Sequence, residues 1–121
     1  MSVAIVKKGI PIRFLDGPYV SCGAPTMEAL GFVDFLIGDI PNAKKFAAQR
    51  LLEMYNSTWT DVDHPTLALD SFISKMGDLE IVIYDEVGSA QLYFSDGDMF
   101  GGHSIDISYS NSKLVHVDIV G

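Results

Sequence analysis

The chain contains little cysteine and no long apolar run. Its single cysteine, Cys22, rules out an internal disulfide framework and fits a reducing compartment. The longest mainly apolar stretch, residues 30–40, is interrupted by Asp34, Gly38 and Asp39, and it is shorter than the roughly 20 residues of a membrane-spanning helix. The apolar residues at the N-terminus precede Lys7 and Lys8, which reverses the order of a secretory signal. These features predict a cytoplasmic protein that does not enter membranes.

Positive charge is also scarce. Lysine and arginine together number 8 against 16 aspartate and glutamate residues, which gives a net charge of −8 at pH 7. Nucleic-acid binding depends on basic side chains that neutralise phosphates, so this class of function is not expected. A basic protein partner does fit, because opposite charge speeds encounter and improves selectivity. Solubility alone also explains an acidic surface, and both explanations stay open.

The sequence lacks a complete motif for catalysis or cofactor binding. The glycine-rich phosphate-binding patterns G-x-x-x-x-G-K-[ST] and G-x-G-x-x-G after a strand do not occur. The nucleophile pattern G-x-S-x-G is absent too, and a strand would point the neighbours His103 and Ser104 to opposite faces. We therefore predict no cofactor and do not expect an enzyme.

The patterns that are present predict one α+β domain over residues 1–121. Apolar residues at three- and four-residue steps predict two helices, at about 41–56 and 65–76. From about 79 to 119 the period becomes two, which predicts an antiparallel four-stranded meander with the two helices packed on one face. Short strands are expected at 3–7, 12–15 and 32–37.

Alternation along the meander assigns its side chains to two faces. The residues expected to face the helices are Leu79, Ile81, Ile83, Leu92, Phe94, Ile105, Ile107, Tyr109, Val115, Val117 and Ile119. The opposite face is expected to be wet and to carry Tyr84 and Tyr93. Two tyrosines on an open face would suit self-association, so a homodimer is one alternative.

The run between residues 94 and 105 holds a cluster of side chains that have two interpretations. Its members are Asp96, Asp98, Phe100, Gly102 and His103, with further glycines between them. In a structural turn, the aspartates accept hydrogen bonds from the glycine-rich backbone and the histidine tethers the loop to the sheet. As a site, the two carboxylates and the imidazole would bind a metal ion in a small hydrolase. The structural turn is the preferred interpretation, and no metal is predicted.

A tryptophan and two aspartates follow the first predicted helix. Trp59 suits a core cap with a polar partner for its indole N–H, and tryptophan is also enriched at binding hot spots. Asp61 and Asp63 suit a solvated loop, with Asp63 available to cap the next helix, or a contact with a basic partner. We assign Trp59, Asp61 and Asp63, together with Asp85 and Glu86 of a later acidic turn, as candidate partner-binding residues.

Several of these elements resemble an uncharacterised bacterial domain family. The resemblance covers about residues 46–121 and rests on a pattern A-x-x-L-L-x-x-x-N-x-x-W, a short F-I-x-K-[LM] helix, an I-x-I strand, the element F-x-D-G-D-x-F-x-G-H-S-I and a final D-I-x-G. The chain departs from this pattern at Gly101, where the family carries an aromatic residue. Small acidic domains of this kind resemble immunity proteins that neutralise a toxin delivered by a neighbouring bacterium.

The leading functional expectation is therefore an immunity-type protein that occludes the active site of a cognate toxin with an acidic face. A toxin with a basic cleft, such as a nuclease, would be the matching partner. The alternative is a small metal-dependent hydrolase that uses Asp96, Asp98 and His103.

Overall fold

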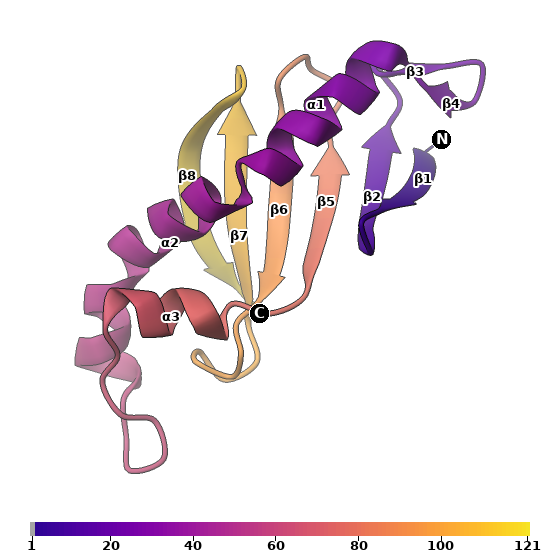
Figure 1. Ribbon diagram of the computed structural model, residues 1–121. Helices are drawn as coiled ribbons and strands as arrows, with labels where there is room; N and C mark the ends of the chain where they lie inside the picture. Colours follow the sequence, from indigo (N-terminus) through magenta and orange to yellow (C-terminus); the bar gives the residue numbers. More distant parts are fainter. Residues whose placement is uncertain (1) are drawn as a thin grey trace.

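A computed structural model describes residues 2–121 and shows three α-helices on one face of a six-stranded sheet (Figure 1). The large sheet contains β1 (Ser2–Lys7), β2 (Ile10–Leu15), β5 (Leu79–Ile83), β6 (Ala90–Ser95), β7 (Ser104–Ser110) and β8 (Lys113–Val120). The helices are α1 (Met27–Gly38), α2 (Ile40–Met54) and α3 (Leu69–Lys75), and a π-helical turn, η1 (Tyr55–Trp59), extends α2. A separate small sheet pairs β3 (Val20–Ser21) with β4 (Ala24–Pro25).

The sheet is larger than the four strands expected from the sequence. Its order is β1-β2-β5-β6-β7-β8, and neighbouring strands run antiparallel except for the parallel pair β2 and β5. The β1–β2 hairpin supplies the two extra strands and joins β5 through three residue pairs, from Ile12↔Ile81 to Phe14↔Ile83. The α+β class is thus confirmed, and the strands expected at 3–7 and 12–15 are present as β1 and β2, which extend the predicted meander to a six-stranded, mostly antiparallel sheet.

The strand expected at residues 32–37 is also wrong, because this segment lies inside α1. The Thr26 side-chain oxygen caps the helix by accepting a hydrogen bond from the Ala29 N–H at 3.1 Å. The buried residues of α1 are Ala29, Phe32, Val33 and Leu36, which share one helical face. Phe35 is 43% exposed, so the apolar run at residues 32–37 combines buried residues of the helix with one that lies outside the core.

The two expected helices are present with different ends. Helix α2 begins at Ile40 and continues through η1 to Trp59, so Asn56 does not terminate it in a left-handed conformation. Helix α3 begins only at Leu69, because residues 65–67 are held against the end of α2. The Asn56 side chain donates to the Leu67 carbonyl at 3.0 Å and accepts from the Leu67 N–H at 2.8 Å. These bonds engage backbone groups that an earlier helical turn would have used.

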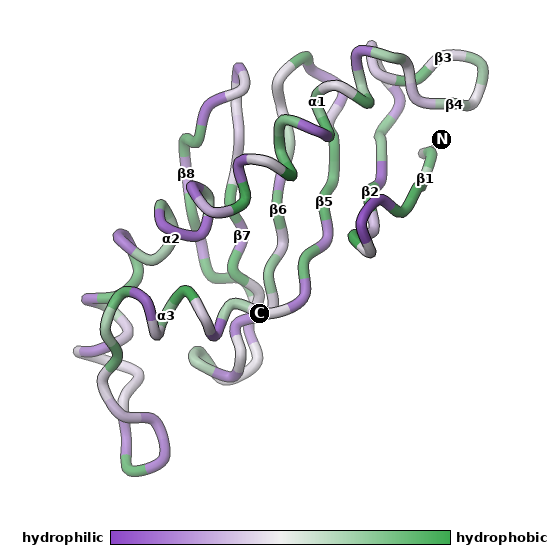
Figure 2. The backbone as a smooth tube through the Cα atoms, viewed as in Figure 1, coloured by the Kyte–Doolittle hydropathy of each residue, from purple (hydrophilic) through white to green (hydrophobic). Residues whose placement is uncertain are grey.

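The core lies between the helices and one face of the sheet. Its largest buried side chains from the sheet are Phe14, Ile81, Ile83, Leu92, Phe94, Ile105 and Ile107. Alanines at positions 43, 47 and 48 form the buried face of α2, and their small side chains let the helix approach the sheet closely. Figure 2 shows the hydropathy that accompanies this packing: β5 is mainly hydrophobic, whereas hydrophilic and hydrophobic residues alternate along α2.

A β-bulge changes which residues of β8 reach the core. Ser108 pairs with His116, but Tyr109 pairs with Leu114, so Val115 is the extra residue between them. Val115 is consequently 54% exposed, and Leu114 packs against the core in its place. Simple alternation along β8 had assigned Val115 to the core face, and the bulge overturns that assignment.

The sheet face away from the helices is less exposed to solvent than the alternation predicts. Val82 in β5 is 2% exposed and Asp106 in β7 is 5% exposed, although both belong to this face. The flanking strands carry Arg13, Gln91 and Tyr93 in register with them, and these longer side chains cover much of the central sheet. We call this the open face, because no helix packs on it (Figure 1).

Candidate functional site

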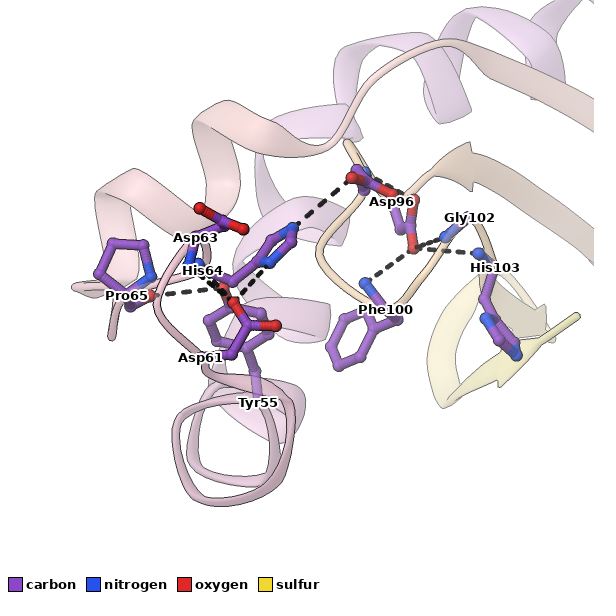
Figure 3. A network of polar contacts seen from close by, with 10 residues as sticks. Tyr55, Asp61, Asp63, His64, Pro65, Asp96, Phe100, Gly102 and His103 are labelled. Carbon is purple, nitrogen blue, oxygen red and sulfur yellow. Dashed lines mark hydrogen bonds and ion pairs between the residues drawn. The ribbon is translucent and has the colours of Figure 1, made fainter.

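The connection between β6 and β7, residues 96–103, is organised around the carboxylate of Asp96. This side chain is 3% exposed and accepts hydrogen bonds from four backbone N–H groups. They belong to Asp98 at 2.8 Å, Phe100 at 2.9 Å, His103 at 3.0 Å and Gly102 at 3.1 Å. Figure 3 shows three of these donors converging on the carboxylate. Such an arrangement uses the short acidic side chain to fix a glycine-rich backbone.

Aromatic side chains from the helices pack against Phe100 of the same connection. Phe100 is fully buried and contacts Tyr55, Trp59 and Phe72 edge-on, with ring centroids 5.4 to 6.0 Å apart. The π-helical turn η1 places Tyr55 and Trp59 at these positions. The Tyr55 hydroxyl also donates to the Pro65 carbonyl at 3.3 Å, which ties the loop after η1 to the same cluster. The connection and this loop therefore form one unit at one end of the sheet.

A histidine joins the two segments. His64 Nδ1 lies 2.9 Å from Asp61 Oδ1, and His64 Nε2 lies 3.5 Å from Asp98 Oδ2. The ring thus stands between a carboxylate of its own loop and a carboxylate of the connection (Figure 3). The Asp61 oxygen also accepts from the backbone N–H groups of Asp63 and His64, which closes the tight turn at the loop tip.

These contacts shift the pKa values of His64 and Asp61 in opposite directions. The hydrogen bond that His64 donates to the Asp61 carboxylate raises the pKa of His64 above its ordinary value, and the Asp61 and Asp98 charges add to this. The same hydrogen bond lowers the pKa of Asp61. The ion pair is complete when His64 is protonated and Asp61 is ionised.

Asp96, Asp98 and His103 lie in one short run of the sequence, but in the structure their three side chains contact different partners. Asp96 binds backbone, Asp98 faces His64, and the His103 ring packs edge-on against Trp59 with centroids 5.8 Å apart. The His103 ring also lies against Gly121, and its buried Nδ1 has no hydrogen-bond partner within residues 2–121. In the same described range, no group of three His, Cys, Asp or Glu residues is arranged to hold a metal ion. A hydrolase built on these three residues gains no support from this geometry.

The candidate partner-binding residues fall into two groups. Trp59, Asp61 and Asp63 lie on or beside the loop after η1, whereas Asp85 and Glu86 lie in the turn between β5 and β6, at the opposite end of the strands (Figure 1). Asp63 does not cap α3, whose N-terminal cap is Ala68. The two groups do not form one compact patch.

Two residues of the first group, Trp59 and Asp61, line a small cavity. Trp59, Asp61, His64 and Asp98 line a hollow of about 240 Å³ together with Met99 and Gly101. We call this end of the molecule, formed by residues 59–64 and 96–103, the acidic end. Its arrangement of an aromatic ring beside carboxylates suits recognition of a cationic group.

Two features of the site escaped sequence reasoning. His64 stands at no recognised metal-ligand spacing in the sequence, and its spacing of three from Asp61 is the signal of a local ion pair. The second feature is Asp106, whose burial in the middle of the open face was hidden by an alternating pattern typical of a solvated surface.

The His64 side chain at the acidic end is expected to have a pKa above that of an ordinary histidine. An NMR titration should give His64 a midpoint above about 6.5, the value of an unperturbed histidine. Because the pKa is raised in the folded state, the stabilisation is complete below the unfolded pKa and is lost as pH rises through the folded one. For Asp61, whose pKa is lowered, the contribution is lost as pH falls.

Single substitutions distinguish the contributions of Asp61 and Asp98 to the raised pKa of His64. Asp61→Asn is expected to lower the His64 midpoint most and Asp98→Asn to lower it less, since Asp61 provides the larger effect. Asp63→Asn is the control, because the Asp63 side chain makes no hydrogen bond to the ring. Equal midpoints in the wild type and Asp61→Asn would contradict the proposed ion pair.

Comparison with known proteins identifies one match. The model of a family described as "uncharacterized protein conserved in bacteria" (DUF2262) matches residues 32–119. The matched region includes most of α1, the acidic end and the strands from β5 to most of β8. Curated proteins and solved structures gave no match. Among residues 2–121, no helix combines the length and apolar character that crossing a bilayer requires.

Proposed function

Because the chain belongs to DUF2262, a family of uncharacterised bacterial proteins, we propose its function from its own surface: it is an immunity-type protein that binds a basic cognate toxin and occludes the toxin's active site. Its acidic end would cover the basic cleft of the toxin. Binding in this way needs no chemistry from the chain itself.

The unbalanced charge at the acidic end carries this proposal. Asp61, Asp63 and Asp98 lie close together there, and none of them forms an ion pair with a lysine or arginine of residues 2–121. His64 is the one cationic group among them, and it is charged only when protonated. A partner that brings basic side chains would therefore supply the missing countercharge and would be attracted from a distance.

Trp59 adds apolar contact area to this end. It is only partly buried, and besides the 240 Å³ hollow it lines a second cavity of about 340 Å³ with Leu51, Met54 and Asp118. Tryptophan combines a large apolar surface with one hydrogen-bond donor, which is why it is enriched at binding hot spots. A cationic side chain could also lie against its ring.

Co-expression with the product of the neighbouring upstream gene tests the function. We expect this chain to restore growth of cells that produce a toxic neighbour and to co-elute with it in a stoichiometric complex. Failure to rescue growth and failure to form a complex would refute the immunity function.

Matched charge variants test the surface. Asp61→Asn with Asp63→Asn is expected to weaken the complex by about tenfold at low salt, because opposite charges at the interface are lost. The control, Asp85→Asn with Glu86→Gln, removes the same amount of charge at the far end of the strands. Equal weakening by the two pairs would mean that net charge, and not the acidic end, controls binding.

A further inference from the structure

The open face of the sheet carries a row of acidic residues that the function proposed above does not use. Strand pairing places Glu80 beside Tyr93, Tyr93 beside Asp106, and Asp106 beside Asp118. The four residues therefore form one line across β5, β6, β7 and β8, on a face that no helix covers (Figure 1). We call this line the carboxylate row; its carboxylates are Glu80, Asp106 and Asp118, and Tyr93 lies between the first two.

The row places like charges opposite each other. Asp106 and Asp118 are direct cross-strand partners, an arrangement that costs stability when both are ionised. Asp106 is 5% exposed, and the Ser104 hydroxyl donates to it. Burial raises the pKa of Asp106 above its usual value, and the Asp118 charge adds to that effect.

The carboxylates of the row have an arginine nearby but form no ion pair with it. Within residues 2–121, Glu80, Asp106 and Asp118 form no ion pair with lysine or arginine. Arg13 on β2 is near enough to influence Tyr93, yet it makes no ion pair with these carboxylates. A folded protein that keeps a nearly buried carboxylate opposite another one retains a destabilising arrangement, which is typical of a surface that binds something.

Tyrosines and a groove complete this surface. The Tyr93 hydroxyl donates to Gln91 at 3.1 Å and lies 3.3 Å from the Tyr84 hydroxyl, so both rings are held in place on the open face. At the end of the row, Glu80, Tyr93 and Ser104 line a groove of about 620 Å³ with Asp78 and His103 among the other lining residues. The groove thus continues from the row to the side of the acidic end.

We infer that the carboxylate row is the docking surface for an arginine-bearing segment of a basic partner protein. This inference rests on the proposed function, and it adds to the acidic end a second contact surface and the chemistry of the partner segment that binds there. Arginine fits because its planar guanidinium binds two carboxylate oxygens at once and stacks on an aromatic ring, whereas lysine offers a point charge. Charge also argues against a second copy as the occupant, because two acidic faces would repel each other.

Titration of the isotopically labelled protein with a hexa-arginine peptide tests the surface directly. We expect amide shifts to be largest at Tyr93, Asp106 and Asp118, and a hexa-lysine peptide to bind several-fold more weakly. The pair Glu80→Gln and Asp118→Asn should weaken hexa-arginine binding about fivefold or more, whereas Asp85→Asn with Glu86→Gln should change it less than about twofold. Both pairs remove equal charge.

Asp106→Asn separates binding from folding. Because it removes the charge that burial and Asp118 disfavour, we expect a higher melting temperature together with weaker binding of hexa-arginine. A lower melting temperature would show that the Asp106 charge serves the fold and would overturn the inference.

Three other outcomes would overturn it as well: shifts confined to residues 59–64, equal binding of the two peptides, or a dimer in solution whose contact is the open face. Shifts at the row, with neither rescue nor a complex in co-expression, would instead support the surface and refute the immunity function.

Discussion

Asp96→Ala is expected to lower the free energy of unfolding by about 4 kcal/mol. The substitution removes a nearly buried carboxylate that accepts four backbone hydrogen bonds and leaves those N–H groups without a partner. Each unsatisfied buried donor costs about 1–3 kcal/mol, and the three that are only partly buried recover some of this through water. Urea unfolding followed by circular dichroism would measure the change as a shift in midpoint at constant slope.

Two further variants test whether the loss of stability comes from the Asp96 carboxylate. Asp96→Asn keeps one carbonyl oxygen in place and should lose less stability than Asp96→Ala. Asp98→Asn is the matched control, because the Asp98 side chain is 76% exposed and asparagine also tolerates its positive φ of 65°. If Asp96→Ala unfolded at the same urea concentration as the wild type, the connection would not depend on the Asp96 carboxylate.

Gly97→Ala is expected to cost about 3 kcal/mol through backbone strain and collision. Gly97 has φ of +58°, and a Cβ atom at this position would lie 2.1 Å from the carbonyl oxygen of Lys75. That oxygen belongs to the last residue of α3, so the helix or the connection would have to move. Thermal unfolding should show a correspondingly lower melting temperature.

Gly102→Ala is the control for this variant. Gly102 also has a positive φ, of +87°, but an added Cβ would meet no atom within 4 Å. It should therefore cost only the conformational penalty, about 1 kcal/mol. Equal losses at the two glycines would show that the approach of α3 to the connection is not tight.

The parts of the fold that follow from local patterns could be predicted from the sequence. Period-two alternation identified β5 to β8, and three- and four-residue spacing identified α2 and α3. The α1 helix was missed because Phe35, an exposed apolar residue, filled the gap between buried positions and gave the appearance of a continuous strand. Its cap at Thr26 was the available signal.

Other features depend on contacts between distant residues. The pairing of Ile12 with Ile81 joins segments about seventy residues apart, and no local pattern specifies such a partner. The bulge at Ser108 and Tyr109 arises from the pairing of two strands, so Val115 could not be placed from alternation alone.

The candidate site shows the same division. The interpretation that an aspartate of the connection binds the glycine-rich backbone needed only local geometry, and Asp96 does make these bonds. The approach of His64 to Asp98 depends on where the loop after η1 lies relative to the β6–β7 connection. The placement of the β5–β6 turn and the β6–β7 connection at opposite ends of the sheet similarly depends on the direction of the strands (Figure 1).

The parallel pairing of β2 with β5 has a consequence for association of the chain with itself. Because β2 of the hairpin pairs with its edge, β5 is an interior strand of the sheet. The edge on that side is formed by β1. A fragment trimmed to the matched residues 32–119 would keep the pairing of β5 with β6 but leave the other edge of β5 unpaired, with Ile81, Val82 and Ile83 in succession. Such an apolar edge is a template for intermolecular strand pairing and aggregation. The hairpin therefore protects the chain from aggregating through β5.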